Sequence, residues 1–188
     1  MDGLLFEKHL TADEIEAGIE HVLASPRNKG TVELIVVRPG VGKRQVLEVG
    51  EFDLERGLIG DNWLKRGSKR TPDGSAHPDM QVNVMNYRFA ELVAGERNRV
   101  PLAGDQLFVD LYLGPDSVQP GTRLRAGTVV LEVTSLPHLG CKKFVERFGL
   151  DAMKYANSEF GRSKNLRGLN ARVVEAGNCR SGDLIERI

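Results

Sequence analysis

Short segments rich in β-branched residues recur along the chain and constrain its fold more than any other feature. TVELIVV begins at Thr31, and RQVLEV follows after a turn that contains Pro39 and Gly40, which predicts a β-hairpin. MQVNVM, QLFVDLYL and the hairpin-like TRLRAGTVVLEVTSL continue the pattern, and the tail LNARVVEAGNCRSGDLIERI predicts two strands about a Gly-Asn turn. Many short strands with few helices predict a mainly β fold of the α+β kind, in the form of a barrel or a sandwich.

Three segments predict helices between or before these strands. Thr11 and Glu14 have the spacing of a capping box, and the helix that follows should end near Pro26. YRFAELVAG predicts a short helix closed by Gly95, and KKFVERFGLDAMKYA predicts another directly after Cys141. Residues 61–80 carry four cations and no apolar period, so we expect a long exposed loop there.

The length of 188 residues favours one domain. We therefore expect an N-terminal helical extension at residues 1–29 and a single globular domain at residues 30–188. The formal net charge is zero, which argues against nucleic acid and anionic membranes as partners. Without a signal-peptide pattern or an apolar run of membrane-spanning length, we expect a cytoplasmic protein.

Two cysteines are too few for a disulfide framework in a chain of this length. Neither belongs to a CxxC pair, which argues against a zinc site. Cys141 lies where a predicted strand gives way to a helix, whereas Cys179 lies in a predicted turn with no motif around it. We therefore expect Cys141 to be the chemically active thiol and Cys179 to be inert.

A series of motifs along residues 30–188 resembles the MOSC domain, the family that includes the C-terminal domain of molybdenum-cofactor sulfurases. Single Gly-Asp pairs are common in turns, but their order along the chain matches the family. Three positions depart from it: Trp63 stands where many members have His, Asp105-Gln106 replaces Glu-Asn, and Ser163-Lys164 replaces a Gly pair. The matching motifs are Arg56-Gly57-Leu58-Ile59-Gly60-Asp61, Gln81, Leu102-Ala103-Gly104-Asp105-Gln106-Leu107, Gly127 before VVLEVTS, Pro137-His138-Leu139-Gly140-Cys141, Gly161-Arg162 and Ser181-Gly182-Asp183.

The resemblance implies a MOSC-type β-barrel that binds molybdenum cofactor or carries sulfur on its cysteine. Such a protein serves as a sulfur transferase or as a component of an oxidoreductase, with a sulfur donor or a redox partner protein. In some members a pyridoxal-phosphate desulfurase domain stands beside the barrel. This chain has no room for that domain, so we expect no pyridoxal phosphate here.

The residues around Cys141 suit that chemistry. A thiol with an ordinary pKa of about 8.5 becomes a better nucleophile or metal ligand beside cations or at a helix N-terminus. Lys142 and Lys143 follow directly, and the predicted helix begins there, so we expect the pKa of Cys141 to fall. His138 could act as a base or contact the ligand, while His77 has a weaker claim.

A phosphorylated cofactor also needs cations and hydrogen-bond donors. We expect Asp61 to orient one of the cations Arg66, Lys69, Arg70 and Arg162, or to cap the loop that follows it. Asn165 and Arg167 could close over a bound anion between Gly161 and Gly168. The cations that we expect to face the ligand are Arg66, Lys69, Arg70, Lys142, Lys143, Arg162 and Arg167, with Cys141 as the metal ligand.

Other interpretations stay open at this point. Cys141 and His138 could be structural residues, and the cations could simply be solvated. The barrel could bind an anion or cofactor without catalysis, or serve as a protein-contact scaffold through residues 61–80. A hydrolase with a Cys141–His138 pair is also conceivable, although closeness in sequence does not establish its geometry.

Overall fold

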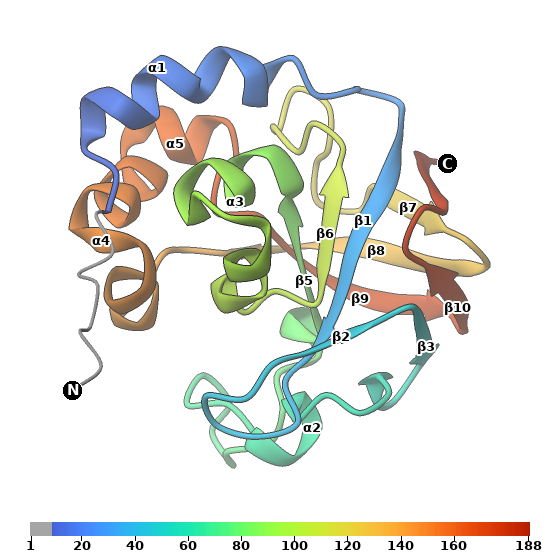
Figure 1. Ribbon diagram of the computed structural model, residues 1–188. Coiled ribbons are helices and arrows are strands. Elements are labelled where there is room, and N and C mark those ends of the chain that lie inside the picture. Colours follow the sequence, from blue (N-terminus) through green and yellow to red (C-terminus); the bar gives the residue numbers. More distant parts are fainter. Residues whose placement is uncertain (1–8) are drawn as a thin grey trace.

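The computed structural model describes residues 9–188, so residues 1–8 of the expected extension lie outside it (Figure 1). Its centre is a closed, mixed β-barrel of seven strands in the order β11-β7-β8-β9-β5-β6-β1, which β1 completes by pairing with β11. Only β5 and β6 run parallel. The predicted mainly β fold is confirmed. The barrel strands are β1 (Lys29–Val37), β5 (Val82–Asn86), β6 (Leu107–Asp110), β7 (Arg123–Ala126), β8 (Val129–Pro137), β9 (Leu169–Glu175) and β11 (Leu184–Arg187).

The sequence of strand β1 is apolar with little alternation, and the packing of the strand explains why. Its register with β6 shifts between Val32 and Leu34, which marks a bulge at Glu33. Val32 and Ile35 belong to one apolar core and Leu34 and Val36 to another. The strand is therefore buried on both faces.

The two apolar cores share the wall of the barrel. One is built from alternate strand residues and fills the interior. The other lies between the outer face of the wall and the helices, with Phe89, Phe144 and Phe148 fully buried. Figure 1 shows these helices on one side of the barrel. They are α1 (Ala12–Leu23), α3 (Tyr87–Ala94) and α4 (Lys142–Asn157).

Helix α1 begins with the predicted capping box. The Thr11 hydroxyl accepts the Glu14 N–H at 3.3 Å, and the Glu14 carboxylate accepts the Thr11 N–H at 2.8 Å. Ile15, Ile19 and Val22 face the outer core, as their spacing predicts. The helix ends at Leu23, three residues before Pro26.

Two short strand pairings lie beside the barrel. Strand β2 (Gln45–Leu47) pairs with β1, which confirms the first hairpin. A three-stranded sheet contains β3 (Val49–Asp53), β4 (Gly57–Leu58) and β10 (Gly177–Arg180). The predicted Gly-Asn turn in the tail is wrong, because Gly177 and Asn178 belong to β10 and pair with β3. Thr128 also bonds to Asn178 through both its backbone and its side chain, so distant contacts override the local turn signal.

The region predicted as a loop at residues 61–80 contains two helical turns, α2 (Trp63–Arg66) and η1 (Pro78–Met80). Trp63 is buried and anchors the first of them. The sequence patterns also missed η2 (Arg97–Ala103) and α5 (Glu159–Ser163), and Gly149 interrupts α4 with a φ of 90°. Within residues 9–188, no helix has both the length and the apolar character needed to cross a membrane.

Candidate functional site

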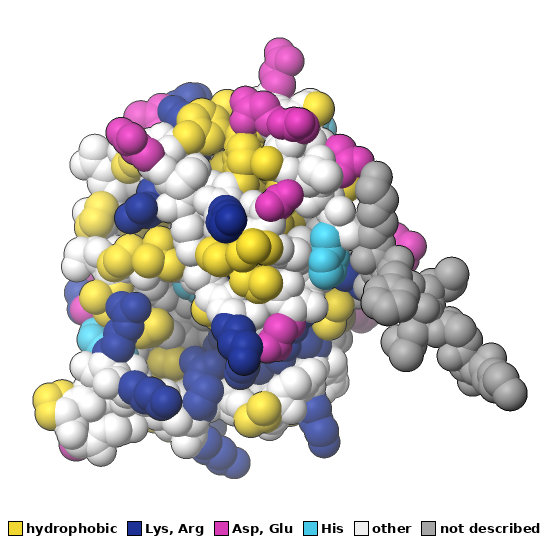
Figure 2. Space-filling view, turned by 90° about the vertical axis from the view of Figure 1, so that its left-hand side faces the viewer, with side chains coloured by type: hydrophobic (Ala, Val, Ile, Leu, Met, Phe, Trp, Pro, Cys, Tyr) yellow, Lys and Arg dark blue, Asp and Glu magenta, His cyan; other side chains and the backbone are white. Residues whose placement is uncertain are grey.

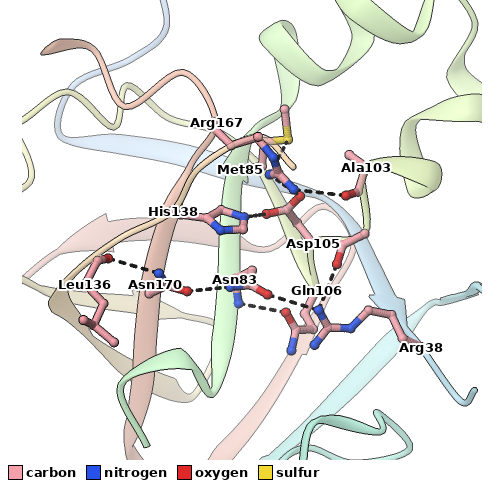
Figure 3. A network of polar contacts seen from close by, with 12 residues as sticks. Arg38, Asn83, Met85, Ala103, Asp105, Gln106, Leu136, His138, Arg167 and Asn170 are labelled. Atoms are coloured by element: carbon pink, nitrogen blue, oxygen red, sulfur yellow. Dashed lines mark hydrogen bonds and ion pairs between the residues drawn. The ribbon is translucent and has the colours of Figure 1, made fainter. Parts of the chain in front are cut away.

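A buried polar network lies at one end of the barrel, where β1 ends, β6 begins and β5 pairs with β9 (Figure 3). Such groups are costly to bury unless they are hydrogen-bonded. Asn83 donates to the Asn170 side chain at 2.7 Å, and Asn170 donates to the carbonyl of Leu136 at 3.0 Å. Gln106 accepts the Asn83 N–H at 2.8 Å. These bonds fix the backbone that carries the charged members of the network.

Asp61 is the carboxylate that holds Arg38 in place. One oxygen accepts from Arg38 N and Nε, and the other accepts from Arg38 Nη2 and from the Trp63 N–H, all at 2.8–2.9 Å. The side chains of Asp61 and Arg38 are 0% and 7% exposed. Asp61 therefore orients Arg38, which is none of the cations that the sequence proposed for it, and it accepts the first N–H of α2. These protein groups occupy both of its carboxylate oxygens.

Asp105 is a second buried carboxylate, held between Arg167 and His138 (Figure 3). Its Oδ2 accepts from Arg167 Nη1 at 2.7 Å, and its Oδ1 lies 2.8 Å from His138 Nε2. Burial alone would raise the pKa of Asp105, but the Arg167 and His138 contacts outweigh it and lower the pKa. Burial and the charge of Arg167 lower the pKa of His138. We therefore assign an ionised Asp105 and a neutral His138.

A small pocket of about 120 Å³ lies between the end of β8 and α5. It brings together four of the predicted site residues: His138, Arg162, Asn165 and Arg167. Arg162 is exposed, with its Nε bonded to the carbonyl of Asn157, while Arg167 is buried over the ring of Phe144. Asn165 donates to the carbonyl of Leu113.

Cys141 occupies the strand-to-helix junction predicted for it, as the N-cap residue of α4. It is exposed, as are Lys142 and Lys143. The peptide before it is fixed, because Asn157 accepts the Gly140 N–H and donates to the Gly140 carbonyl, at 2.8 and 2.9 Å. Cys141 does not line the 120 Å³ pocket, whose wall reaches Leu139, two residues earlier.

Arg66, Lys69 and Arg70 lie apart from that pocket. They line an open hollow of about 670 Å³ formed by residues 66–72, Gly74 and Met80. Figure 2 shows Lys and Arg side chains gathered over the lower part of the face on which the helices lie, with acidic groups mainly above them. Five of the predicted cations are therefore divided between two depressions, and Lys142 and Lys143 line neither of them.

Two arginines that the sequence did not indicate complete the basic region. Arg44 follows the turn after β1, and its buried Nε has no hydrogen-bond partner. Burial, Arg147 and Arg38 lower the pKa of Arg44 to about 10. An ideal Cβ on Gly104 would lie 2.9 Å from the Arg44 guanidinium, so the glycine gives that group room. In the sequence, Arg44 and Arg147 resemble ordinary solvated cations, and only the tertiary structure brings them together.

The comparisons with known proteins bear on the fold. No family model matches the chain, and no curated protein matches it. Among solved structures, YuaD from Bacillus subtilis has a TM-score of 0.58 and 18% identity, over 85% of this chain and 95% of that one. YiiM from Escherichia coli has a TM-score of 0.53 and 19% identity, over 84% and 69%. YiiM from Geobacillus stearothermophilus has a TM-score of 0.53 and 16% identity, over 85% and 75%. YuaD and YiiM are MOSC-domain proteins. The chain has a MOSC-like fold.

Several of the sequence motifs shared with MOSC domains build this MOSC-like barrel. Gln81 donates to the carbonyl of Leu54 at 2.8 Å and accepts the Val173 N–H at 2.7 Å, so it ties three segments together. Gly57 has a φ of +68°, and an ideal Cβ there would lie 2.9 Å from the Gln81 side chain. These positions therefore maintain the fold.

The departures from the family pattern have clear places in the structure. Trp63 is the first residue of α2 and is 5% exposed. Asp105 and Gln106 are both fully buried in the polar network. Ser163 donates to the carbonyl of Phe160 at the end of α5. Asp105 thus keeps a carboxylate at a position where Glu is commoner in the family, on a side chain that is one methylene shorter.

The remaining candidates lie elsewhere. Cys179 is buried in the barrel core, where burial and the nearby Asp183 raise its pKa to about 12. A thiol in that state is a poor nucleophile, which supports its use as an inert control. His77 caps η1 by accepting the Asp79 N–H at 3.2 Å.

Proposed function

We propose that this MOSC-like barrel binds molybdenum cofactor, or a closely related phosphorylated anion, on its basic face, with Cys141 as the reactive thiol. The observation that carries the proposal is an excess of guanidinium charge around two buried carboxylates. Asp61 pairs with Arg38, and Asp105 pairs with Arg167. Both carboxylates also attract Arg44, and Asp61 attracts Arg66. Arg147 adds a further positive charge that acts on Arg44. Such a cluster favours an anion.

The residues present fit such a cofactor. Its phosphate needs guanidinium donors, and the buried Nε of Arg44 is a donor without a partner. The 670 Å³ hollow has a volume in the range of about 300–1,000 Å³ that is typical of ligand sites. When bound, the cofactor would supply an oxidised molybdenum centre. Within residues 9–188, no group of three or more His, Cys, Asp or Glu side chains could hold a metal ion, so the cofactor would have to bring further ligands.

In this proposal the thiol of Cys141 is either a ligand of the metal or the carrier of a transferred sulfur atom. Its thiol is exposed at the start of α4, and the exposed Lys142 and Lys143 follow it directly. A deprotonated Cys141 can ligate a metal, or it can attack the outer sulfur of a persulfide on a donor protein and release the donor's thiolate. Asn157 holds the adjoining peptide of Gly140 and so limits where the thiol can move.

A second version leaves Cys141 passive. It is favoured by the absence of Cys141 from the walls of both the 670 Å³ hollow and the 120 Å³ pocket. In that version the arginines alone hold the ligand, and the protein is a non-catalytic binding module. Binding that survives Cys141→Ala would support this version over the thiol-centred one.

The arginine cluster is tested by cofactor retention. Wild type, Arg44→Gln, Arg147→Gln and the exposed control Arg125→Gln would be purified anaerobically from a molybdenum-replete host. Pterin fluorescence released on denaturation measures the bound cofactor. We expect retention in wild type and Arg125→Gln and a loss of about tenfold or more in each of the other two, because each removes a charge-assisted donor. Equal retention in all four, or none in wild type, would contradict the proposal.

A further inference from the structure

The 120 Å³ pocket has its own chemistry, separate from the thiol. Its wall contains two guanidinium groups, Arg162 and Arg167, and the imidazole of His138. Arg167 is 5% exposed and its buried Nε–H has no hydrogen-bond partner. An unsatisfied buried donor of this kind is costly unless a ligand or water accepts from it. The pocket therefore offers donors to an oxyanion.

His138, in contrast, contributes a hydrogen-bond acceptor to the pocket. Its Nε2 lies 2.8 Å from Oδ1 of Asp105, whose other oxygen is bonded to Arg167 at 2.7 Å. Because the ionised carboxylate can only accept, Nε2 must carry the proton. In a neutral imidazole the other nitrogen, Nδ1, is then an acceptor. Burial and Arg167 lower the pKa of His138, which keeps the ring neutral near pH 7.

We propose that this pocket binds a small oxyanion that carries a proton, such as hydrogen phosphate, whose O–H donates to Nδ1 of His138 while its other oxygens accept from Arg162 and Arg167. An anion without a proton would place an oxygen lone pair against the lone pair of Nδ1. That repulsion selects phosphate over sulfate, although the two ions have the same shape.

The size of the pocket sets the class of ligand. A space of about 120 Å³ that is partly open to solvent accommodates one tetrahedral oxyanion. A larger part of a ligand would extend out of the pocket. The occupant is therefore a free anion or the phosphoryl end of a larger phosphate monoester.

Calorimetric titration with inorganic phosphate and with sulfate at pH 7 tests the proposal. We expect phosphate to bind wild type at least about tenfold more tightly than sulfate, because a site built to accept a ligand O–H rejects an analogue that lacks it. In His138→Gln the side-chain amide can donate to either anion, so the preference should fall to less than about threefold. Titration with glycerol phosphate then tells a free anion from a monoester.

Two controls separate this site from the basic face. Arg66→Gln should leave the phosphate preference unchanged, because Arg66 lines the other hollow. Cys141→Ala should also leave it unchanged, so failure of the thiol-centred proposal would not disturb this result. Equal affinity of wild type for phosphate and sulfate, or no binding of phosphate at millimolar concentration, would overturn the inference.

A measurement on the unaltered protein avoids reliance on a folded variant. Long-range ¹H–¹⁵N correlation spectra report which imidazole nitrogen carries the proton. We expect neutral His138 with its proton on Nε2 at pH 7, and shifts of the Leu139 and Arg162 amide signals on addition of phosphate. An imidazolium ring, or a proton on Nδ1, would remove the acceptor and refute the proposal.

Discussion

Charged side chains at the barrel end depend on one another, so removing one has consequences beyond its own contacts. Arg38 is buried, and its Nε and Nη2 donate hydrogen bonds to the Asp61 carboxylate. Its Nη1 donates to the Asn83 side chain and to the Gly104 carbonyl. A buried guanidinium without its carboxylate is an uncompensated charge. The stability of the site therefore rests on such pairs.

Asp61→Ala should lower the free energy of unfolding by about 3–5 kcal/mol, because it leaves Arg38 buried and unpaired. Urea denaturation monitored by circular dichroism measures the loss. The matched control is Asp116→Ala, which breaks the exposed pair with Arg27 and should cost much less. Similar losses in the two variants would contradict this account of Asp61.

The pH dependence of stability should carry the signature of His138. Its folded pKa is lowered from the ordinary value of 6.5, so the unfolded chain binds the extra proton first and stability falls as the pH drops below about 6.5. Burial lowers the pKa of His138 most, the charges of Arg167 and Arg38 lower it further, and Asp105 opposes them. We expect the free energy of unfolding to decrease from pH 7.5 to pH 5, and to decrease less in His138→Gln. If the free energy of unfolding fell equally with pH in wild type and in His138→Gln, His138 would not be the cause of the pH dependence.

At the residue scale, part of the site could be predicted from the sequence. The position of Cys141 before a helix follows from local patterns. The burial of Cys179 does not, because the sequence placed it in a turn and the structure places it in β10, inside the barrel core. The roles of Arg44 and Arg147 could not be predicted, because they depend on how β2 and α4 are placed against Gly104. Arg66, Lys69 and Arg70 were grouped with Arg162 and Arg167 because all are cations, yet they line different depressions.

Elements in this fold begin and end through specific local contacts. Thr11→Ala should lower the free energy of unfolding by about 1 kcal/mol, because the Glu14 N–H loses its acceptor at the start of α1. Thr11→Ser keeps the hydroxyl and serves as the control, with a smaller expected change. Thermal unfolding of the three proteins measures both effects. A Thr11→Ser loss equal to that of Thr11→Ala would show that the cap oxygen does not matter.

Gly168, which precedes β9, combines two constraints. Its φ is +107°, and an ideal Cβ would lie 2.3 Å from the carbonyl oxygen of Val84 in β5. Gly168→Ala should therefore destabilise the protein by more than about 2 kcal/mol. Gly182→Ala is the control, since its φ is +92° but its Cβ would meet nothing within 4 Å. Comparable urea midpoints for the two variants would contradict a clash against β5.

Most elements follow from local patterns, and the exceptions have a common cause. The capping box of α1 and the alternation of buried and exposed residues in β7 and β8 are local signals, and the tertiary structure matches them. The Gly-Asn pair at residues 177–178 is also a turn signal, but pairing with β3 overrides it. Helix α2 was missed because one buried residue, Trp63, and one capping carboxylate, Asp61, stabilise it.

At the scale of the whole molecule, the order of motifs predicted a MOSC-type barrel, and the structure has that architecture. What the sequence could not supply is the closure of the barrel by β1 and β11, which joins segments about 150 residues apart. Closure matters for the site, because it leaves one end where buried polar groups from β1, β5, β6 and β9 meet.

The most direct test of the proposed function is the molar ratio of molybdenum to protein, measured by elemental analysis after anaerobic purification. Wild type, Cys141→Ala and Cys179→Ala would be compared, with intact mass recorded for each. A cofactor site with Cys141 as the reactive thiol predicts molybdenum or an added sulfur atom in wild type and Cys179→Ala and a loss confined to Cys141→Ala. Metal-free, unmodified protein in all three samples would contradict it.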